Sequence, residues 1–274
     1  MQLLSRRHRL IVSLWACLIV AALGSAQLRA AEAVDLELIL AVDVSGSVDF
    51  DEAELQRKGY LSAMADPTVI AAIRGGAYRK IAVSYVEWAG LGHYKVVVDW
   101  TVISDTASAR AFVEKLGAAP MQRAHRTSIS DAIEKSIPRF AANRFDGLRR
   151  IIDISGDGAN NYGNLVNEAR DKAVKAGIVI NGLPILSDPK TQNIPTIQNL
   201  DLFYRDCVIG GPGAFHVVAN GFKDFARAIR RKLILEIAGR APQARIWHAT
   251  ARESPPCNSG EWRWMGIMSG GTRE

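Results

Sequence analysis

The sequence is poor in cysteine and histidine, and neither residue type shows the spacing of a metal site. Its 274 residues include three cysteines and five histidines. Zinc sites need closely spaced cysteines and histidines, whereas four of the histidines stand far apart, at His93, His125, His216 and His248. The sequence therefore gives no reason to expect a zinc centre.

Several catalytic and nucleotide-binding motifs are also absent. No Gly-x-Gly-x-x-Gly follows the first strand-like segment, and the glycine-rich residues 210–213 lack the Lys-Ser/Thr pair of a phosphate-binding loop. There is no Gly-x-Ser-x-Gly, and no histidine stands near Ser45 or Ser155 in a triad pattern. The segment Asp43-Val44-Ser45 lacks the second aspartate of a haloacid-dehalogenase-like phosphatase. We therefore expect a protein that is not an enzyme, with a metal-assisted hydrolase as the enzymatic alternative.

The net charge of +6 arises largely from the first 30 residues. This segment contains four arginines and no Asp or Glu, and the remaining charges nearly balance. Because this excess lies in a segment with the features of an export signal, it does not argue for nucleic-acid binding. We expect no nucleic-acid partner.

Residues 1–33 are predicted to be a bacterial signal peptide of the Sec type. Basic residues 6–9 precede an apolar run over residues 10–23, which is short for a membrane span, and small residues follow. Cleavage after Ala26 and cleavage after Ala33 both fit. We expect the mature chain to be periplasmic or secreted, without a stable membrane span. An uncleaved membrane anchor is the alternative.

Two cysteines, Cys207 and Cys257, lie outside this leader. In an oxidising compartment two thiols pair more often than they stay free. We therefore predict a disulfide between them, and two unrelated thiols are the alternative.

Residues 34–239 alternate between strand-like and helix-like patterns, which predicts an α/β domain with a mostly parallel sheet. The predicted strands cover residues 36–44, 80–88, 94–103, 149–155, 178–186 and 215–219, and the predicted helices begin near Asp49 and cover 108–116, 128–140, 164–176 and 222–238. A short glycine-containing link between residues 88 and 94 predicts a hairpin, and hence one antiparallel strand. Residues 240–274 form a tail rich in Trp, Pro and Gly, which covers the domain's own surface or binds a partner.

Three oxygen-bearing residues, Asp43, Ser45 and Ser47, directly follow the first buried strand. Hard cations such as Mg²⁺ take oxygen ligands, and α/β proteins bind ligands at the carboxyl ends of their strands. The pattern predicts a divalent-cation site, although the same residues could instead cap the helix near Asp49.

Two later motifs strengthen the metal interpretation. Thr127 precedes a predicted helix, and Asp157 follows a later buried strand in the segment Ser155-Gly156-Asp157-Gly158. Together with Asp43-x-Ser45-x-Ser47, these motifs resemble the metal-ion-dependent adhesion site (MIDAS) of von Willebrand factor A (vWA) domains. Within these domains the sequence resembles the bacterial, exported DUF1194 family, on the residues 86–88, 156–161 and 210–215.

The resemblance implies a Rossmann-like vWA domain over residues 34–239, with one antiparallel edge strand and helices on both faces of the sheet. It implies a metal held by Asp43, Ser45, Ser47, Thr127 and Asp157, with Mg²⁺ preferred over Mn²⁺ or Ca²⁺. In this family the serines, and sometimes the threonine, ligate directly, while the aspartates often act through water. One position stays open for an acidic side chain of a protein partner. The implied function is metal-dependent protein binding, and a structural vWA module with a vestigial site is the alternative.

Three further features leave alternatives open. Arg126 stands where the family has glycine before the threonine, so the loop could differ in conformation from that of the family. Ser128 or Ser130 could then replace Thr127 as a ligand. Asp153, inside an apolar strand, either orients the site or is a structural acid bonded to backbone or to an arginine. The basic residues beside Thr127 either contact an acidic partner or form a solvated loop.

Overall fold

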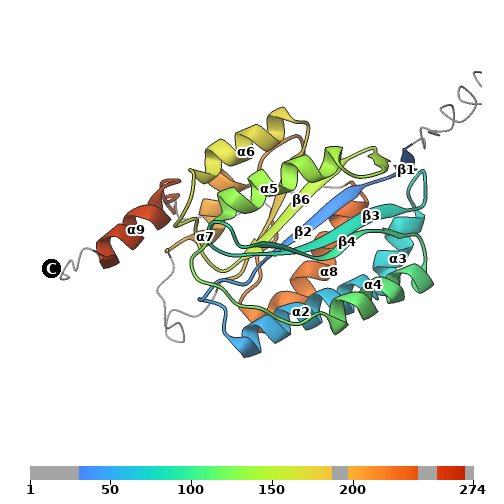
Figure 1. Cartoon of the computed structure of the whole chain (residues 1–274), viewed down its shortest axis with the longest axis horizontal. Coiled ribbons are helices and arrows are strands. Elements are labelled where there is room, and N and C mark those ends of the chain that lie inside the picture. Colours follow the sequence, from blue (N-terminus) through green and yellow to red (C-terminus); the bar gives the residue numbers. More distant parts are fainter. Residues whose placement is uncertain (1–30, 187–196, 240–251, 269–274) are drawn as a thin grey trace, which may run out of the picture. The chain divides into compact units, whose positions relative to one another are not determined.

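The computed structural model describes residues 31–186, 197–239 and 252–268, which Figure 1 shows in colour. The chain divides into two units, Met1–Ala31 and Glu32–Glu274, and all the elements below belong to the second. The predicted leader lies outside the described residues except at its end, where β1 (Glu32–Val34) begins. Within the described residues, no helix combines the length and the apolar character needed to cross a membrane.

A five-stranded sheet with the order β4-β3-β2-β6-β7 forms the centre of this unit. Its strands are β2 (Glu37–Asp43), β3 (Ile81–Trp88), β4 (Tyr94–Ile103), β6 (Arg150–Gly156) and β7 (Val179–Pro184). All neighbours are parallel except β4, which pairs antiparallel with β3 at the edge. The predicted mostly parallel sheet with one antiparallel edge strand is therefore confirmed. A separate parallel pair joins β1 to β5 (Phe145–Gly147).

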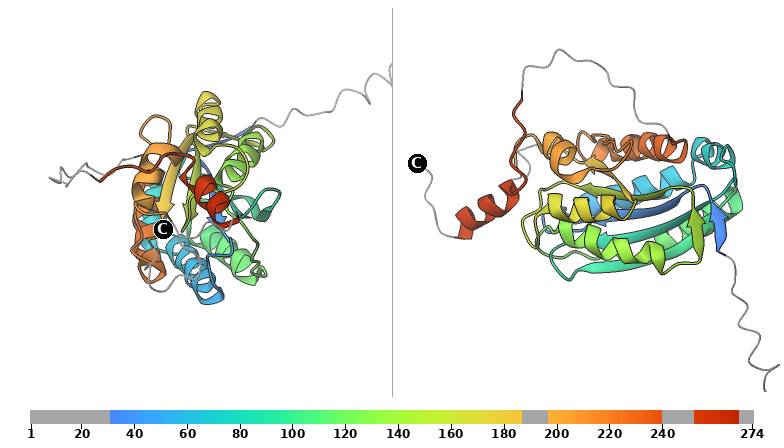
Figure 2. Two further views of the ribbon diagram at one scale, coloured as in Figure 1. Left: turned by 90° about the vertical axis from the view of Figure 1, so that its left-hand side faces the viewer. Right: turned by 90° about the horizontal axis from the view of Figure 1, so that it is seen from above.

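Helices cover both faces of the sheet, as expected for a Rossmann-like α/β domain (Figures 1 and 2). One face carries α2 (Phe50–Met64), α3 (Pro67–Arg74), α4 (Thr106–Ala118) and α8 (Phe225–Ile237). The other carries α5 (Ile129–Ala141), α6 (Val166–Lys175), α7 (Leu200–Phe203) and the π-helical turn η1 (Tyr204–Val208). Side chains of β2 alternate between the two cores, with Leu38 and Leu40 in one and Ile39 and Ala41 in the other. Because both faces are buried, the strand reads as a continuous apolar run.

The capping interpretation of the first motif does not hold, because Asp49 caps α2 without help from Asp43. The Asp49 side chain accepts a hydrogen bond from the Glu52 backbone N–H, and Glu52 accepts one from the Asp49 N–H. This reciprocal capping box satisfies two backbone donors at the start of the helix. Asp43 and the two serines are free for another role.

The strand predicted over residues 215–219 is wrong. This segment makes only isolated bridges to the β7 region, at His216 and Ala219. The Phe215 N–H donates to the Asn181 side chain (3.0 Å), so a side chain replaces part of the backbone ladder. The predicted helix over 222–238 begins instead with a short 3-10 turn, η2 (Phe222–Asp224). Sequence analysis also missed α3, α7 and, in the tail, α9 (Ser259–Met268).

A buried ion cluster links α8 to the sheet. The Lys232 Nζ lies 2.5 Å from Asp153 Oδ1 and 2.5 Å from Glu236 Oε1, and none of the three residues is more than 1% exposed. Asn181 of β7 donates a further hydrogen bond to Glu236 (2.8 Å). Burial, then repulsion from Glu236, raises the pKa of Asp153 to about 7. Asp153 is therefore a structural acid whose partner is a lysine, rather than backbone or an arginine.

Replacing this lysine should destabilise the domain strongly. Lys232→Met leaves two carboxyl groups buried without their cation, and breaking a buried pair in this way costs about 3–5 kcal/mol. Urea unfolding at neutral pH measures the loss. Arg231→Met, an exposed change on the same helix, should stay within about 0.5 kcal/mol of wild type. Equal stability of the two variants would contradict the assigned role of the cluster.

Candidate metal centre

The carboxyl ends of β2 and β6 bring the first and third motifs together. Asp43 is the last residue of β2, and Asp157 directly follows β6. The turn after β2 folds back tightly, because the Ser45 N–H donates to Asp43 Oδ1 (2.7 Å) and the Val48 N–H donates to the Ser45 carbonyl (3.1 Å). These two adjacent parallel strands end at the same edge of the sheet, so residues more than 100 positions apart become neighbours.

A chain of hydrogen bonds connects four of the five predicted ligands. Ser45 Oγ lies 3.1 Å from Ser47 Oγ, and the Ser47 hydroxyl donates to Asp157 Oδ1 (2.7 Å). Asp43 and Asp157 are fully buried and Ser45 is 1% exposed. Asp43 Oδ2 and Asp157 Oδ2 have no hydrogen-bond partner among the described residues. Two carboxylate oxygens are therefore buried and free to accept a cation.

Thr127 lies beside this cluster without a hydrogen bond to it among the described residues. It is 4% exposed and lines the same cavity as Ser47 and Asp157. Its backbone N–H donates to Asn161 Oδ1 (3.0 Å), and its carbonyl accepts from the Asn161 N–H (2.9 Å). Asn161 thus connects the loop that contains Arg126 and Thr127, called the threonine loop below, to the loop that follows Asp157.

The two substitute ligands are engaged elsewhere. Ser128 caps α5, because its hydroxyl accepts from the Asp131 N–H (3.3 Å). The Ser130 hydroxyl lies 3.4 Å from that of Ser128, and the Ser130 N–H donates to the Asn160 side chain (3.0 Å). Thr127 is therefore the better candidate of the three.

Arg126 adopts the backbone conformation for which glycine is suited. Its φ is +69°, in the left-handed region that residues with a Cβ rarely occupy. Gly90 makes room for it, since a Cβ on Gly90 would lie 2.6 Å from the His125 carbonyl oxygen and 2.8 Å from the Arg126 Cβ. The loop thus keeps the glycine-type backbone although its side chain is arginine.

Burial dominates the electrostatics of the two aspartates. It raises the pKa of Asp43 well above its ordinary value, and repulsion from Asp157 raises it further. Burial likewise raises the pKa of Asp157 to about 6. A nearby cation would favour the charged forms and oppose these shifts. Two carboxylates with serine and threonine hydroxyls form an oxygen-only donor set, which fits a hard divalent cation. Within the described residues, no group of three or more His, Cys, Asp or Glu side chains offers another metal site.

Tyr204 is a neighbour of the site that sequence analysis missed. Its hydroxyl is fully buried and has no hydrogen-bond partner among the described residues. A Cβ added at Gly156 would lie 2.8 Å from Asp43 Oδ2 and 3.0 Å from the Tyr204 hydroxyl. The two oxygens therefore lie on the same side of that glycine. No motif marks Tyr204, because it reaches the site from η1 through the fold alone.

A cavity of about 310 Å³ opens beside these residues. Its wall includes residues of the first motif, the threonine loop and the Asp157 loop, together with three residues of α9: Gly46, Ser47, His125, Arg126, Thr127, Asp157, Gly158, Ala159, Asn161, Ile197, Gly260, Arg263 and Trp264. In Figure 1, α9 lies at the end of the sheet where the parallel strands terminate. The tail thus contributes to the surroundings of the site.

Comparison with known proteins supports the class of domain that this topology defines. The fold is that of a vWA domain. Residues 33–241 match the family model described as "Protein of unknown function (DUF1194)", and the chain belongs to this family. No curated protein matches the sequence.

Solved structures with similar folds share little sequence with this chain. Proximal thread matrix protein 1 (PTMP1) from the mussel byssus matches with a TM-score of 0.55 and 13% identity, over 76% of this chain and 49% of that one. The pilus adhesin SpaC from Lactobacillus rhamnosus GG matches with a TM-score of 0.54 and 14% identity, over 75% and 31% of the two chains. A von Willebrand factor type A structure from Catenulispora acidiphila has a TM-score of 0.49 and 14% identity, over 75% and 43%. The match thus spans about half of PTMP1 and less of SpaC, and at these identities the likeness concerns the fold.

The raised pKa of Asp157 predicts how the stability of the metal-free protein depends on pH. In EDTA the native state holds a proton on Asp157 that the unfolded state releases near pH 4. The contribution of this group to the free energy of unfolding is therefore complete below that pH. It should fall as the pH rises through about 6, by about 3 kcal/mol from this group. Asp157→Asn should make the dependence between pH 4 and 7 shallower, and the slope that remains comes from Asp43 and Asp153, whose pKa values are also raised. Thermal unfolding across this pH range tests it, and an equal slope in both proteins would refute the assignment.

Proposed function

We propose that this protein is a metal-dependent module that binds an acidic side chain of a partner protein. The observation that carries the proposal is the pair of buried, unpartnered Oδ2 atoms of Asp43 and Asp157 beside an open cavity. The other oxygen of each carboxylate accepts a hydrogen bond, from the Ser45 N–H and the Ser47 hydroxyl respectively. Burying two like charges together is unfavourable unless a cation accompanies them. A divalent cation supplies that charge, and Mg²⁺ suits the oxygen donors best.

Each predicted ligand has a role in this proposal. The hydroxyls of Ser45, Ser47 and Thr127 would hold the cation directly, and Asp43 and Asp157 would act through bound water. Since the direct ligands are neutral, the cation keeps much of its charge and attracts a further anionic ligand. The cavity gives a partner's carboxylate access to it. PTMP1 has been solved with zinc in its MIDAS motif, which supports a divalent cation at the corresponding edge of this fold.

Binding explains the site without catalysis. The carboxylate of a partner needs an electrophilic cation and room to approach, and no covalent step follows. The names of PTMP1 and SpaC identify a matrix protein and a pilus adhesin, which supports a role in recognition. We therefore propose that the chain is not an enzyme.

We also propose that residues preceding β1 are removed as a signal peptide and that the mature protein is periplasmic or secreted. The disulfide between Cys207 and Cys257 suits an oxidising compartment. Of the two cleavage positions, Ala26 leaves β1 whole, whereas cleavage after Ala33 would divide it. Cleavage after Ala26 is therefore the better choice.

Thermal unfolding with and without Mg²⁺ tests the metal site. A ligand that binds only the native state, at about 100 times its dissociation constant, adds about 2.7 kcal/mol. The wild-type protein should therefore melt at a higher temperature in Mg²⁺ than in EDTA. Asp43→Ala and Asp157→Ala should lose this response, because each removes one of the two carboxylates.

Asp146→Ala is the matched control, since Asp146 is an exposed aspartate of β5. It should keep the full response to Mg²⁺. A wild-type protein that folds but melts identically in EDTA, Mg²⁺, Mn²⁺ and Ca²⁺ would contradict the proposal and favour a vestigial site.

A further inference from the structure

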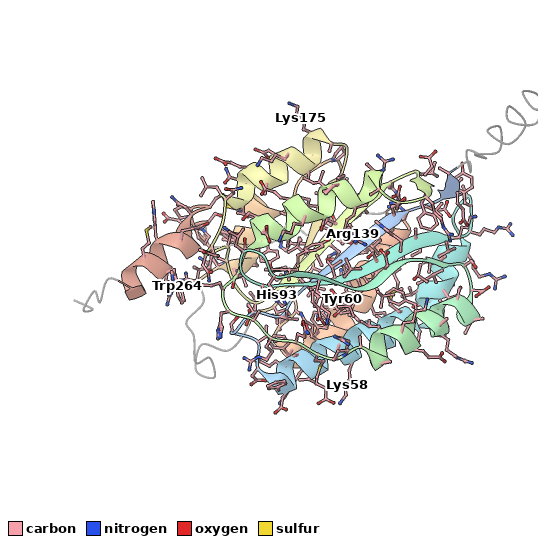
Figure 3. All side chains as sticks on the ribbon, viewed as in Figure 1. Lys58, Tyr60, His93, Arg139, Lys175 and Trp264 are labelled. Carbon is pink, nitrogen blue, oxygen red and sulfur yellow. A yellow bond between two sulfur atoms is a disulfide. The ribbon has the colours of Figure 1, made fainter. Side chains whose placement is uncertain are left out.

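The helix α9 forms part of the wall beside the candidate metal centre, although it lies beyond the family match, which ends at residue 241. Gly260, Arg263 and Trp264 line the same cavity as Ser47 and Asp157. Trp264, labelled in Figure 3, lies under the Arg126 guanidinium, whose carbon is 3.9 Å from the ring centroid. The tail helix and the threonine loop therefore meet over the site.

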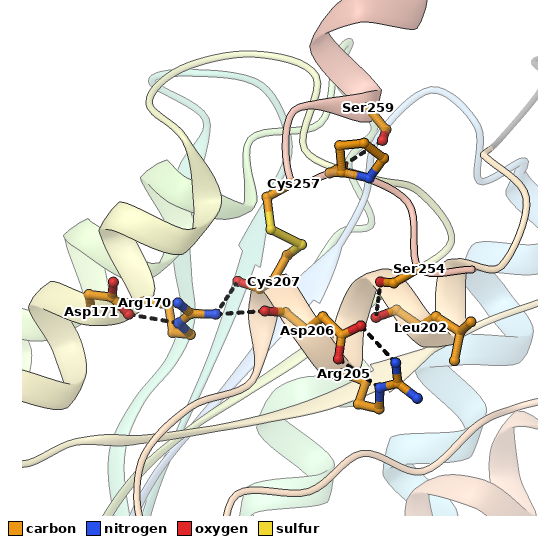
Figure 4. The surroundings of a disulfide bond; sticks show 10 residues. Arg170, Asp171, Leu202, Arg205, Asp206, Cys207, Ser254, Cys257 and Ser259 are labelled. Atoms are coloured by element: carbon orange, nitrogen blue, oxygen red, sulfur yellow. Dashed lines mark hydrogen bonds and ion pairs between the residues drawn. A yellow bond between two sulfur atoms is a disulfide. The ribbon is translucent and has the colours of Figure 1, made fainter. Parts of the chain in front are cut away.

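Several bonds hold the segment that leads into α9 against the domain. The disulfide joins Cys257 to the buried Cys207 of η1 (Figure 4). Arg252 forms an ion pair with Asp201 (2.6 Å), and the Glu253 carbonyl accepts a hydrogen bond from the Asn199 side chain (3.1 Å). These contacts connect the tail to α7 and η1, so the start of α9 is anchored from one side.

The start of α9 also packs closely on the loop that follows Asp157. The Asn160 side chain donates to Glu261 Oε1 (2.7 Å). A Cβ added at Gly260 would lie 1.9 Å from the Asn160 carbonyl oxygen, whereas one added at Gly266 meets nothing within 4 Å. Only glycine at position 260 allows this approach, so an alanine there must move the helix away from the site.

The cavity wall carries two arginines that form no ion pair with the described carboxylates. Arg126 and Arg263 line the cavity, and the ion pairs of the described residues include neither of them. The Arg126 guanidinium carbon lies 3.9 Å from the Trp264 ring centroid and 5.2 Å from that of Tyr162. The guanidinium forms no hydrogen bond to a described residue, and its N–H groups suit a carboxylate. The indole N–H of Trp264 is buried without a hydrogen-bond partner among the described residues. These groups suit a second negative charge beside the one that the metal would take.

We propose that α9 and the threonine loop form the walls of a cleft beside the metal site, and that this cleft binds a narrow peptide segment with two neighbouring acidic residues. One carboxylate meets the cation, and the other meets Arg126 and Arg263. The proposal rests on the metal-dependent binding described above and adds the partner's chemistry. A flat protein surface fits this site less well, because α9 rises beside it as a wall.

Fluorescence anisotropy with short labelled peptides in Mg²⁺ tests the cleft. The probes are Gly/Ser peptides that carry two adjacent aspartates, one aspartate, or two lysines in place of the aspartates. The wild-type protein should bind the two-aspartate peptide about tenfold more tightly than the one-aspartate peptide, as expected for an added charge-assisted hydrogen bond. The lysine peptide and all samples in EDTA should show no binding.

Three variants test the role of the cleft wall separately from that of the metal site. Gly260→Ala, Arg263→Gln and Arg126→Gly should each reduce the preference for two aspartates, while the melting response to Mg²⁺ stays intact. The last change suits the positive φ at position 126, so it removes the guanidinium without straining the loop. Gly266→Ala, on the same helix as Gly260, should behave as wild type.

The outcomes distinguish this proposal from the one on which it rests. Equal binding of the one- and two-aspartate peptides, or a preference unchanged in all three variants, would overturn the cleft while leaving metal-dependent binding in place. A melting response to Mg²⁺ without binding of either acidic peptide would also overturn it. Absence of both the melting response and peptide binding would refute the metal site itself.

Discussion

The burial of Asp43 and Asp157 at one edge of the sheet is the constraint on which the rest of the site depends. Removal from water favours the neutral form of a carboxyl group, so burial raises the pKa of both residues, and repulsion from Asp157 raises the pKa of Asp43 further. The surrounding serines satisfy only one oxygen of Asp157, and the backbone one oxygen of Asp43. The remaining oxygen of each carboxylate has no hydrogen-bond partner among the described residues. Two charged carboxylates are therefore unfavourable at this edge without a cation, and a cation bound there would stabilise them.

Three other buried acids, Asp153, Glu236 and Glu87, have a cation of the chain as a partner. Asp153 and Glu236 lie in the same interior, yet Lys232 supplies their positive charge from within the chain. Arg57 likewise pairs with the buried Glu87. These structural carboxylates are thus paired with lysine or arginine side chains of the chain. Within the described residues, Asp43 and Asp157 form no such ion pair. This contrast within one domain supports the proposal that Asp43 and Asp157 bind a cation from solution.

Much of the fold could be predicted from local patterns, because a strand buried on both faces reads as an apolar run and a capping box marks a helix start. The predicted bounds of β3 and β4 differ from those observed by at most one residue. The segment 215–219 was mistaken for a strand because its apolar residues suit one, while the Asn181 side chain that takes its N–H is distant in sequence. α3 was overlooked although Asp66 and Pro67 give it an N-cap and a favourable first residue.

The sequence by itself determined the fold class and indicated a set of candidate oxygen ligands, since both follow from short patterns of residues next to apolar strands. Only the tertiary structure decided that hydrogen bonds connect Asp43, Ser45, Ser47 and Asp157. It placed Tyr204 close to Asp43 and Lys232 beside Asp153. It also placed Trp264 against Arg126, through a disulfide and a helix that no periodicity connects to the site. Contacts between distant segments depend on how the elements pack, and this information is not present in any one stretch of the chain.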